Sequence, residues 1–183
     1  LDSHAVRKRE PGRAHLDGFF SYPTKPYTVP YGVIVPQKVD NLLTPVPVSG
    51  THIGFSTLRM EPCWMALGQA AGVAASISIE TGVPVRKVDM PRLQRTLLKQ
   101  KAVLIHFSDV APTHKYFEAA QFFGLRGLLP DWTARLDEAA TVEDAAKWIA
   151  AIGGQKPAGY VPGKTTRGEL LHHLYRESPV GQD

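Results

Sequence analysis

The stretch EPCWMALGQAAGVAASISIETGVP, residues 61–84, decides the fold more than any other part of this sequence. Pro62 suits the first position of a helix, and the run TGVP at 81–84 is a stop signal, so a helix is predicted over residues 62–80. Residues 63–79 carry no charge. A helix that is apolar on every side is either buried or spans a membrane.

The composition of this helix decides between burial and membrane insertion. A membrane span needs about 20 strongly apolar residues, whereas this segment is rich in Ala, Gly and Ser and has Gln69 within it. We therefore expect a buried helix and no transmembrane segment. Its small residues, Gly68, Ala71, Gly72 and Ala75, would let another backbone, a sheet or a flat ligand approach closely.

The sequence before this helix differs in composition, being rich in proline and in short apolar runs. Eight of the 15 prolines fall within the first 62 residues, where short apolar runs are bounded by Pro and Gly. Such runs are typical of strands, and prolines inside them place several at edges or bends. The predicted strands cover residues 27–29, 31–35, 39–43 and 46–48.

The sequence after the helix is mostly helical. A second helix is predicted to open at Asp89 and to end near residues 100–101, with a strand-like run at 103–105. Thr113, Thr141 and Thr166 can each cap a further helix, and Thr166 forms a capping box with Glu169. These helices are expected over residues 113–124, 141–153 and 166–177.

Length, charge and single residues exclude several classes of protein. The chain has 183 residues, a net charge of +4 and one cysteine, Cys63, so no internal disulfide can form. The longest basic run, residues 7–9, is too short for the basic stripe that nucleic-acid binding needs. The adjacent His172 and His173 point about 100° apart on a helix, which argues against a shared metal ion. No metal site is therefore expected.

Two features suggest that the chain is a fragment of a longer protein. It begins at Leu1 without an initiator Met or a signal-peptide pattern. No two glycines are separated by a single residue, so the Gly-x-Gly of a dinucleotide-binding loop is absent.

A polar segment at residues 49–62 is the best candidate site. It leads from a predicted strand into the start of the buried helix, where free amides and the helix dipole favour negative charge on a ligand. Side-chain donors are supplied there by Thr51, His52, Ser56 and Arg59. The alternative, which the pattern alone favours, is that these residues only cap and pack a loop.

Residues 1–105 resemble the C-terminal part of a bacterial family of FAD-dependent oxidoreductases, some of whose members are labelled xanthan lyases. The resemblance rests on the runs YGVIVP at 31–36, VDNLLTPV at 39–46, SGTH at 49–52 and LRMEPCWMALGQAAGVAA at 58–75. Where many members have Ala-Gly-Arg after the Asn-Leu-Leu run, this chain has Pro45, Val46 and Pro47.

The resemblance implies a fold, a reaction and a set of roles. The fold would be mixed α/β, the C-terminal part of a glutathione-reductase-like flavoprotein, with cap strands and a flavin-facing helix within residues 1–106. The reaction would be hydride transfer from a small-molecule substrate to FAD, with the N-terminal Rossmann part of the same protein as partner. His52 and Arg59 would act on the substrate. The residues implied to line the flavin are Ser49, Thr51, Ser56, Arg59, Met60, Glu61 and Pro62.

Residues 107–177 resemble a degenerate S-layer-homology module. The resemblance rests on FSDV at 107–110 and TTRGELL at 165–171. It implies a small helical domain over 107–183, and as an alternative function a non-catalytic module that binds envelope glycans or a protein. The resemblances imply a bacterial protein and leave its compartment open, with the cell envelope or periplasm as candidates. We expect the isolated chain to be inactive and not to hold FAD.

Overall fold

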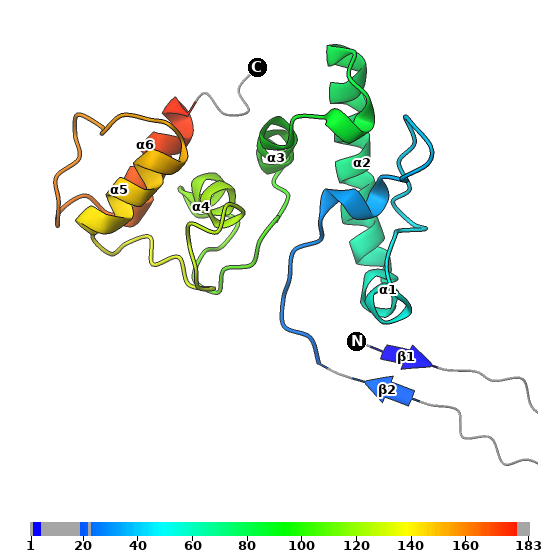
Figure 1. The fold of residues 1–183 in the computed structure, drawn as a ribbon. Coiled ribbons are helices and arrows are strands. Elements are labelled where there is room, and N and C mark those ends of the chain that lie inside the picture. The colour runs from blue at the N-terminus through cyan, green and yellow to red at the C-terminus, as the bar shows by residue number, and fades with distance from the viewer. Residues whose placement is uncertain (1, 5–18, 22, 179–183) are drawn as a thin grey trace, which may run out of the picture. The chain divides into compact units, whose positions relative to one another are not determined.

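The computed structural model describes residues 2–4, 19–21 and 23–178 (Figure 1). The chain divides into two compact units, Leu1–Val88 and Asp89–Asp183, each of which is described by itself. The basic run at 7–9 lies outside the described residues.

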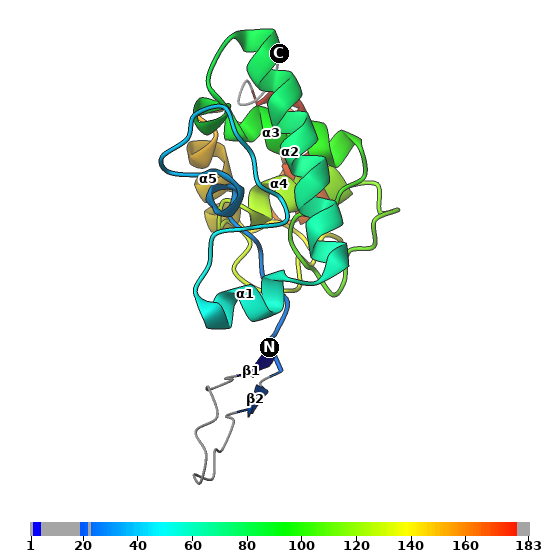
Figure 2. The same ribbon diagram turned by 90° about the vertical axis from the view of Figure 1, so that its right-hand side faces the viewer.

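The first unit is built around one long helix. Strand β1 (Asp2–His4) pairs antiparallel with β2 (Phe19–Ser21), and the remaining elements are the 3-10 helices η1 (Tyr31–Ile34) and η2 (Val85–Lys87) and the helices α1 (His52–Leu58) and α2 (Glu61–Thr81). Figures 1 and 2 show α1 lying across the beginning of α2.

Helix α2 confirms the helix predicted over residues 62–80. Pro62 occupies the first turn, and Gly82 ends the helix with a φ of 68°, a left-handed conformation that glycine adopts without strain. Leu67, Ala71, Ala74 and Ile77 are buried along one face.

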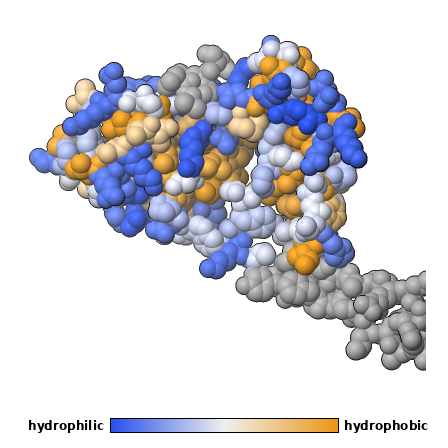
Figure 3. All heavy atoms as spheres, in the orientation of Figure 1, coloured by the Kyte–Doolittle hydropathy of each residue, from blue (hydrophilic) through white to orange (hydrophobic). Residues whose placement is uncertain are grey.

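Burial of α2 on every side was expected, and in the described structure it holds for one face only. Met65 is 74% exposed and Ile79 is 82% exposed, and apolar patches interrupt the hydrophilic surface of the first unit (Figure 3). By length and composition, α2 is the one described helix that could cross a membrane, a test that core helices of soluble proteins also pass.

Loops hold the rest of the first unit together through a small apolar core and specific hydrogen bonds. Ile34, Val48 and Leu58 pack with the buried face of α2. The Tyr31 hydroxyl donates to the carbonyl of Val85 at 2.9 Å. The Arg86 guanidinium binds the Asp40 carboxylate and donates to the carbonyls of Pro36 and Val39 at 3.0 and 3.1 Å, and so fastens the 36–40 loop to η2.

The expected α/β, glutathione-reductase-like fold is wrong for this structure, which is helical apart from the short β1–β2 pair in the described residues. None of the strands predicted between residues 27 and 48, or at 103–105, is formed, and residues 31–34 are a 3-10 helix. A strand is stable only when its main-chain groups pair with a neighbouring strand. Here only single bonds cross between the loops, such as Thr44 N to Ile34 O at 2.8 Å.

The second unit is helical, as predicted. It contains α3 (Met90–Lys99), α4 (Phe117–Gly124), α5 (Val142–Ala151) and α6 (Arg167–Glu177). Its core buries large side chains completely, among them Phe122, Phe123, Trp148, Leu170 and Leu171.

Two of the three threonine caps predicted in the second unit are confirmed by the observed N-caps. Thr141 accepts from the amide of Asp144 at 3.0 Å, and Thr166 forms the expected capping box with Glu169. Thr113 is not a cap, because α4 begins at Phe117. The compact units separate after Val88, so α3 belongs to the second unit; the proposed change of domain after residue 106 stays a prediction.

Candidate functional site

The candidate segment 49–62 contains a short helix that the sequence did not predict. Thr51 caps α1, and its Oγ1 accepts from the amide of Gly54 at 3.0 Å. The Tyr27 hydroxyl lies 2.7 Å from Thr57 Oγ1 and fixes one side of this helix. The polar residues are therefore distributed along α1 rather than gathered in one loop.

Three of the predicted cofactor-lining residues make local bonds. Ser56 is buried and donates to the carbonyl of Ile53 at 2.6 Å, and Thr51 is occupied as the cap of α1. The amide of Ser49 donates to the carbonyl of Val33 at 2.7 Å, while its side chain is exposed. The hydroxyls of Thr51 and Ser56 and the amide of Ser49 are thus already bonded within the chain. The role of these three residues at a cofactor stays a prediction.

The other predicted residues are exposed at the two ends of α1. His52 begins α1 and Arg59 follows its last residue, so about 10 Å of helix axis separates the two. The structure thus does not bring His52 and Arg59 together. Arg59 instead lies beside Met60 and Glu61, at the start of α2.

The start of α2 has no side-chain cap. Met60 occupies the cap position and offers no hydrogen bond from its side chain, while its carbonyl accepts from the amides of Cys63 and Trp64 at 3.0 and 3.1 Å. Glu61 and Pro62 are exposed in the first turn. Because Pro62 has no N–H and the amides of Cys63 and Trp64 donate to Met60, the first turn offers a ligand little beyond the amide of Glu61 and the positive end of the helix dipole. Glu61 already supplies one negative charge there.

Burial affects two further side chains near this turn, the thiol of Cys63 and the indole of Trp64. Burial raises the pKa of the Cys63 thiol, which packs against the core of the first unit. Trp64 is partly buried, and its Nε1 is a buried atom without a hydrogen-bond partner, the one such side-chain atom in the described part of the chain. Sequence reasoning missed Trp64, because no sequence pattern reports whether an indole N–H finds an acceptor.

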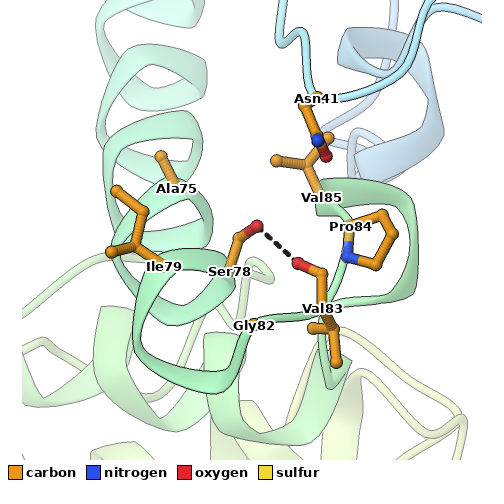
Figure 4. A pocket seen from close by; sticks show the side chains of 8 residues that line it. All are labelled: Asn41, Ala75, Ser78, Ile79, Gly82, Val83, Pro84 and Val85. Atoms are coloured by element: carbon orange, nitrogen blue, oxygen red, sulfur yellow. Dashed lines mark hydrogen bonds between the residues drawn. The ribbon is translucent and has the colours of Figure 1, made fainter.

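A cavity of about 430 Å³ lies at the other end of α2. Figure 4 shows Asn41, Ser78 and Val85 around it, with the Ser78 hydroxyl donating to the carbonyl of Val83 at 2.5 Å. The lining on α2 begins at Ala75, 14 residues after Glu61, so about 20 Å of helix separates this cavity from the exposed turn at Glu61. The cavity is therefore not part of the candidate site. Among the described residues, no three His, Cys, Asp or Glu side chains gather as metal ligands.

Comparison with known proteins identifies the family. A family model described as "FAD dependent oxidoreductase" matches residues 1–97, more than half of the 183, a range that includes α1, α2 and most of α3. The chain therefore belongs to the FAD-dependent oxidoreductase family. No curated protein and no solved structure matches it. The xanthan lyase label and the S-layer-homology resemblance receive no support from these comparisons.

The residues at the start of α2 fit part of an FAD site. The turn offers a helix start without a side-chain cap and the exposed cation Arg59. FAD is planar at one end and rich in acceptor oxygens. A helix start and a cation are the kinds of group that suit an acceptor-rich edge, so the residues of this turn fit one edge of FAD.

Proposed function

We propose that this chain is the C-terminal portion of an FAD-dependent oxidoreductase that transfers a hydride from a small-molecule substrate to flavin. The observation that carries the proposal is the family match, which spans the exposed turn between α1 and α2. FAD would supply the two-electron acceptor. The chain's own residues would bind the cofactor's edge and orient the substrate.

The exposed residues divide between these two tasks. Arg59, Met60, Glu61 and Pro62, which are contiguous and exposed, would line the flavin. His52 and Arg59 would bind or polarise the substrate from opposite ends of α1. Ser49, Thr51 and Ser56 would contribute mainly by holding the main chain in place, since Thr51 and Ser56 already make local side-chain bonds.

The FAD-binding part of the protein would be the partner of this chain. The sequence contains no Gly-x-Gly loop to hold a pyrophosphate, so the chain by itself should not retain FAD.

The full-length protein tests this function through its absorption spectrum. We expect bound flavin after purification or after reconstitution with FAD, and no retained flavin in residues 1–183 alone. In the active protein, His52→Gln and Arg59→Gln should each lower kcat/KM by about 100-fold, whereas Thr113→Ala, an exposed residue in the second unit, should not. A full-length protein that neither contains nor takes up FAD contradicts the proposal.

One observation favours a second candidate, a non-catalytic binding module. The second unit has a cavity of about 410 Å³ lined by Tyr116, Glu169, His172, His173, Arg176 and Glu177. Its aromatic and polar lining would suit an envelope glycan or a peptide. Retention of the chain on purified envelope polysaccharide would support this candidate, and no retention would leave the helical unit with a packing role.

A further inference from the structure

The segment that leads into η1 is tied to the rest of the first unit by two tyrosine hydroxyls. Tyr31 donates to the carbonyl of Val85 at 2.9 Å, and the hydroxyl of Tyr27 lies 2.7 Å from Thr57 Oγ1. Between the two tyrosines, Val29 packs against the apolar core. Alternate residues of this segment therefore hold it to α1, to the core and to η2.

The bond from Tyr27 acts on the last turn of α1. Thr57 comes two residues before Arg59, whose amide donates to the carbonyl of Phe55 at 2.9 Å at the end of the helix. Phe55 and Leu58 pack against the core of the first unit, and they project from α1 in other directions than Thr57 does. The main chain that carries the exposed Arg59 is therefore held by the core on one side and by Tyr27 on another.

We infer that Tyr27 is a positioning residue that holds Arg59 at the edge of the flavin through Thr57; this inference rests on the proposed function. A cation at that edge stabilises the negative charge that a flavin gains on reduction, and so raises its reduction potential. Without the bond to Tyr27, the last turn of α1 is free to shift. A shift of about 1 Å at a reacting group is enough to weaken its effect strongly.

The competing interpretation is that the bond from Tyr27 only stabilises the first unit. Tyr31 separates the two interpretations, because it makes the same kind of bond from the same segment but reaches η2 instead of α1. A purely stabilising role predicts the same behaviour for the loss of either hydroxyl. A positioning role predicts that only the loss at Tyr27 changes the flavin.

The test measures the reduction potential of FAD bound to the full-length protein. Arg59→Gln should lower the potential because it removes the cation, and Tyr27→Phe should lower it by a smaller amount. Tyr31→Phe is the matched control: it should lower the thermal unfolding midpoint and leave the potential unchanged. Thr57→Val should repeat the effect of Tyr27→Phe, whereas Thr57→Ser keeps a hydroxyl and should restore the wild-type potential.

The outcomes separate this inference from the proposed function. If the wild-type protein binds FAD and Tyr27→Phe leaves the potential unchanged, the inference is wrong and the proposed function stands. Equal shifts of the potential in Tyr27→Phe and Tyr31→Phe also overturn it, because the effect then follows from general stability. An unchanged potential in Arg59→Gln overturns it as well, since Arg59 then does not act on the flavin. A wild-type protein that binds no FAD contradicts the proposed function, and the inference with it.

Discussion

Arg95 donates from Nη2 to the main-chain carbonyl of Tyr175 at 2.9 Å, and its guanidinium lies 4.1 Å from the centre of the Tyr175 ring. The guanidinium also lies 4.5 Å from the centre of the Phe122 ring, and the side chain is buried. Arg95 thereby fastens α3 to α4 and α6. The last helix reached by the family match is thus an integral part of the second unit.

Replacing Arg95 with Met should destabilise the second unit by about 2–4 kcal/mol, because a buried carbonyl loses its donor and two ring faces lose their cation. Urea unfolding followed by tryptophan fluorescence, to which the buried Trp148 contributes, measures the change. Lys99→Met, an exposed change on the same helix, is the control. Equal unfolding midpoints for the two variants would show that the Arg95–Tyr175 contact contributes nothing.

Thr141→Ala and Thr166→Ala should each lower the free energy of unfolding by about 1 kcal/mol, because each removes a side-chain acceptor from a helix start. Thr113→Ala is the matched control, since Thr113 is exposed and does not begin a helix. Thermal unfolding measures all three variants. A loss at Thr113 as large as at Thr141 would contradict the helix starts described here.

Gly72→Ala should stabilise the isolated chain by about 1 kcal/mol, because glycine is unfavourable within a helix and the added methyl group meets no atom within 4 Å. In the full-length protein the same change should instead weaken FAD retention, if the FAD-binding part packs closely on this exposed face of α2. Gly168→Ala provides the opposite reference within the chain, because its methyl group would collide with the Tyr116 ring. Stabilisation by Gly72→Ala in both proteins would exclude a close approach at Gly72.

The second unit should lose stability as the pH falls below about 6.5, partly through His172. Burial lowers the pKa of His172 from its ordinary value of 6.5, Arg176 and His173 lower it further, and Glu118 opposes them. The unfolded chain therefore binds more protons than the folded one in this range, so stability is present above pH 6.5 and is lost below it.

His172→Phe, which keeps a ring against Tyr116, should flatten this dependence. Urea unfolding at pH 8 and pH 5.5 measures the slope. The pKa of Glu169 is lowered from 4.5 by its bonds to Thr166, so its contribution is lost only at lower pH and does not overlap this window. An unchanged slope in His172→Phe would contradict the role given to His172.

Local signals predicted the helices well. Pro62 and Gly82 bound α2, and Thr141 and Thr166 cap α5 and α6, because the groups that start or end a helix lie within a few residues of each other. The sequence does not predict the short helix α1, although its cap, Thr51, is one of the polar donors of the candidate segment.

The predicted strands were wrong because a strand depends on partners that lie far away in the sequence. Residues 39–43 have the composition of a strand, but no neighbouring strand pairs with them. Instead the Arg86 guanidinium donates to the carbonyl of Val39. The candidate site was predicted in part for the same reason. The exposed Arg59 and Met60 follow from their position in the sequence, whereas the internal bonds of Ser56 and the unsatisfied Trp64 do not.

The sequence by itself determined the family, the long helix α2, two helix caps and the helical character of the second unit, because these depend on neighbouring residues or on a long ordered match. Only the tertiary structure decided which face of α2 is buried and that His52 and Arg59 lie at opposite ends of α1. The same holds for the packing of α3 into the second unit through Arg95 and for the missing acceptor of the Trp64 indole. Each of these depends on which distant atoms meet, and in a folded chain that is set by packing rather than by order along the sequence.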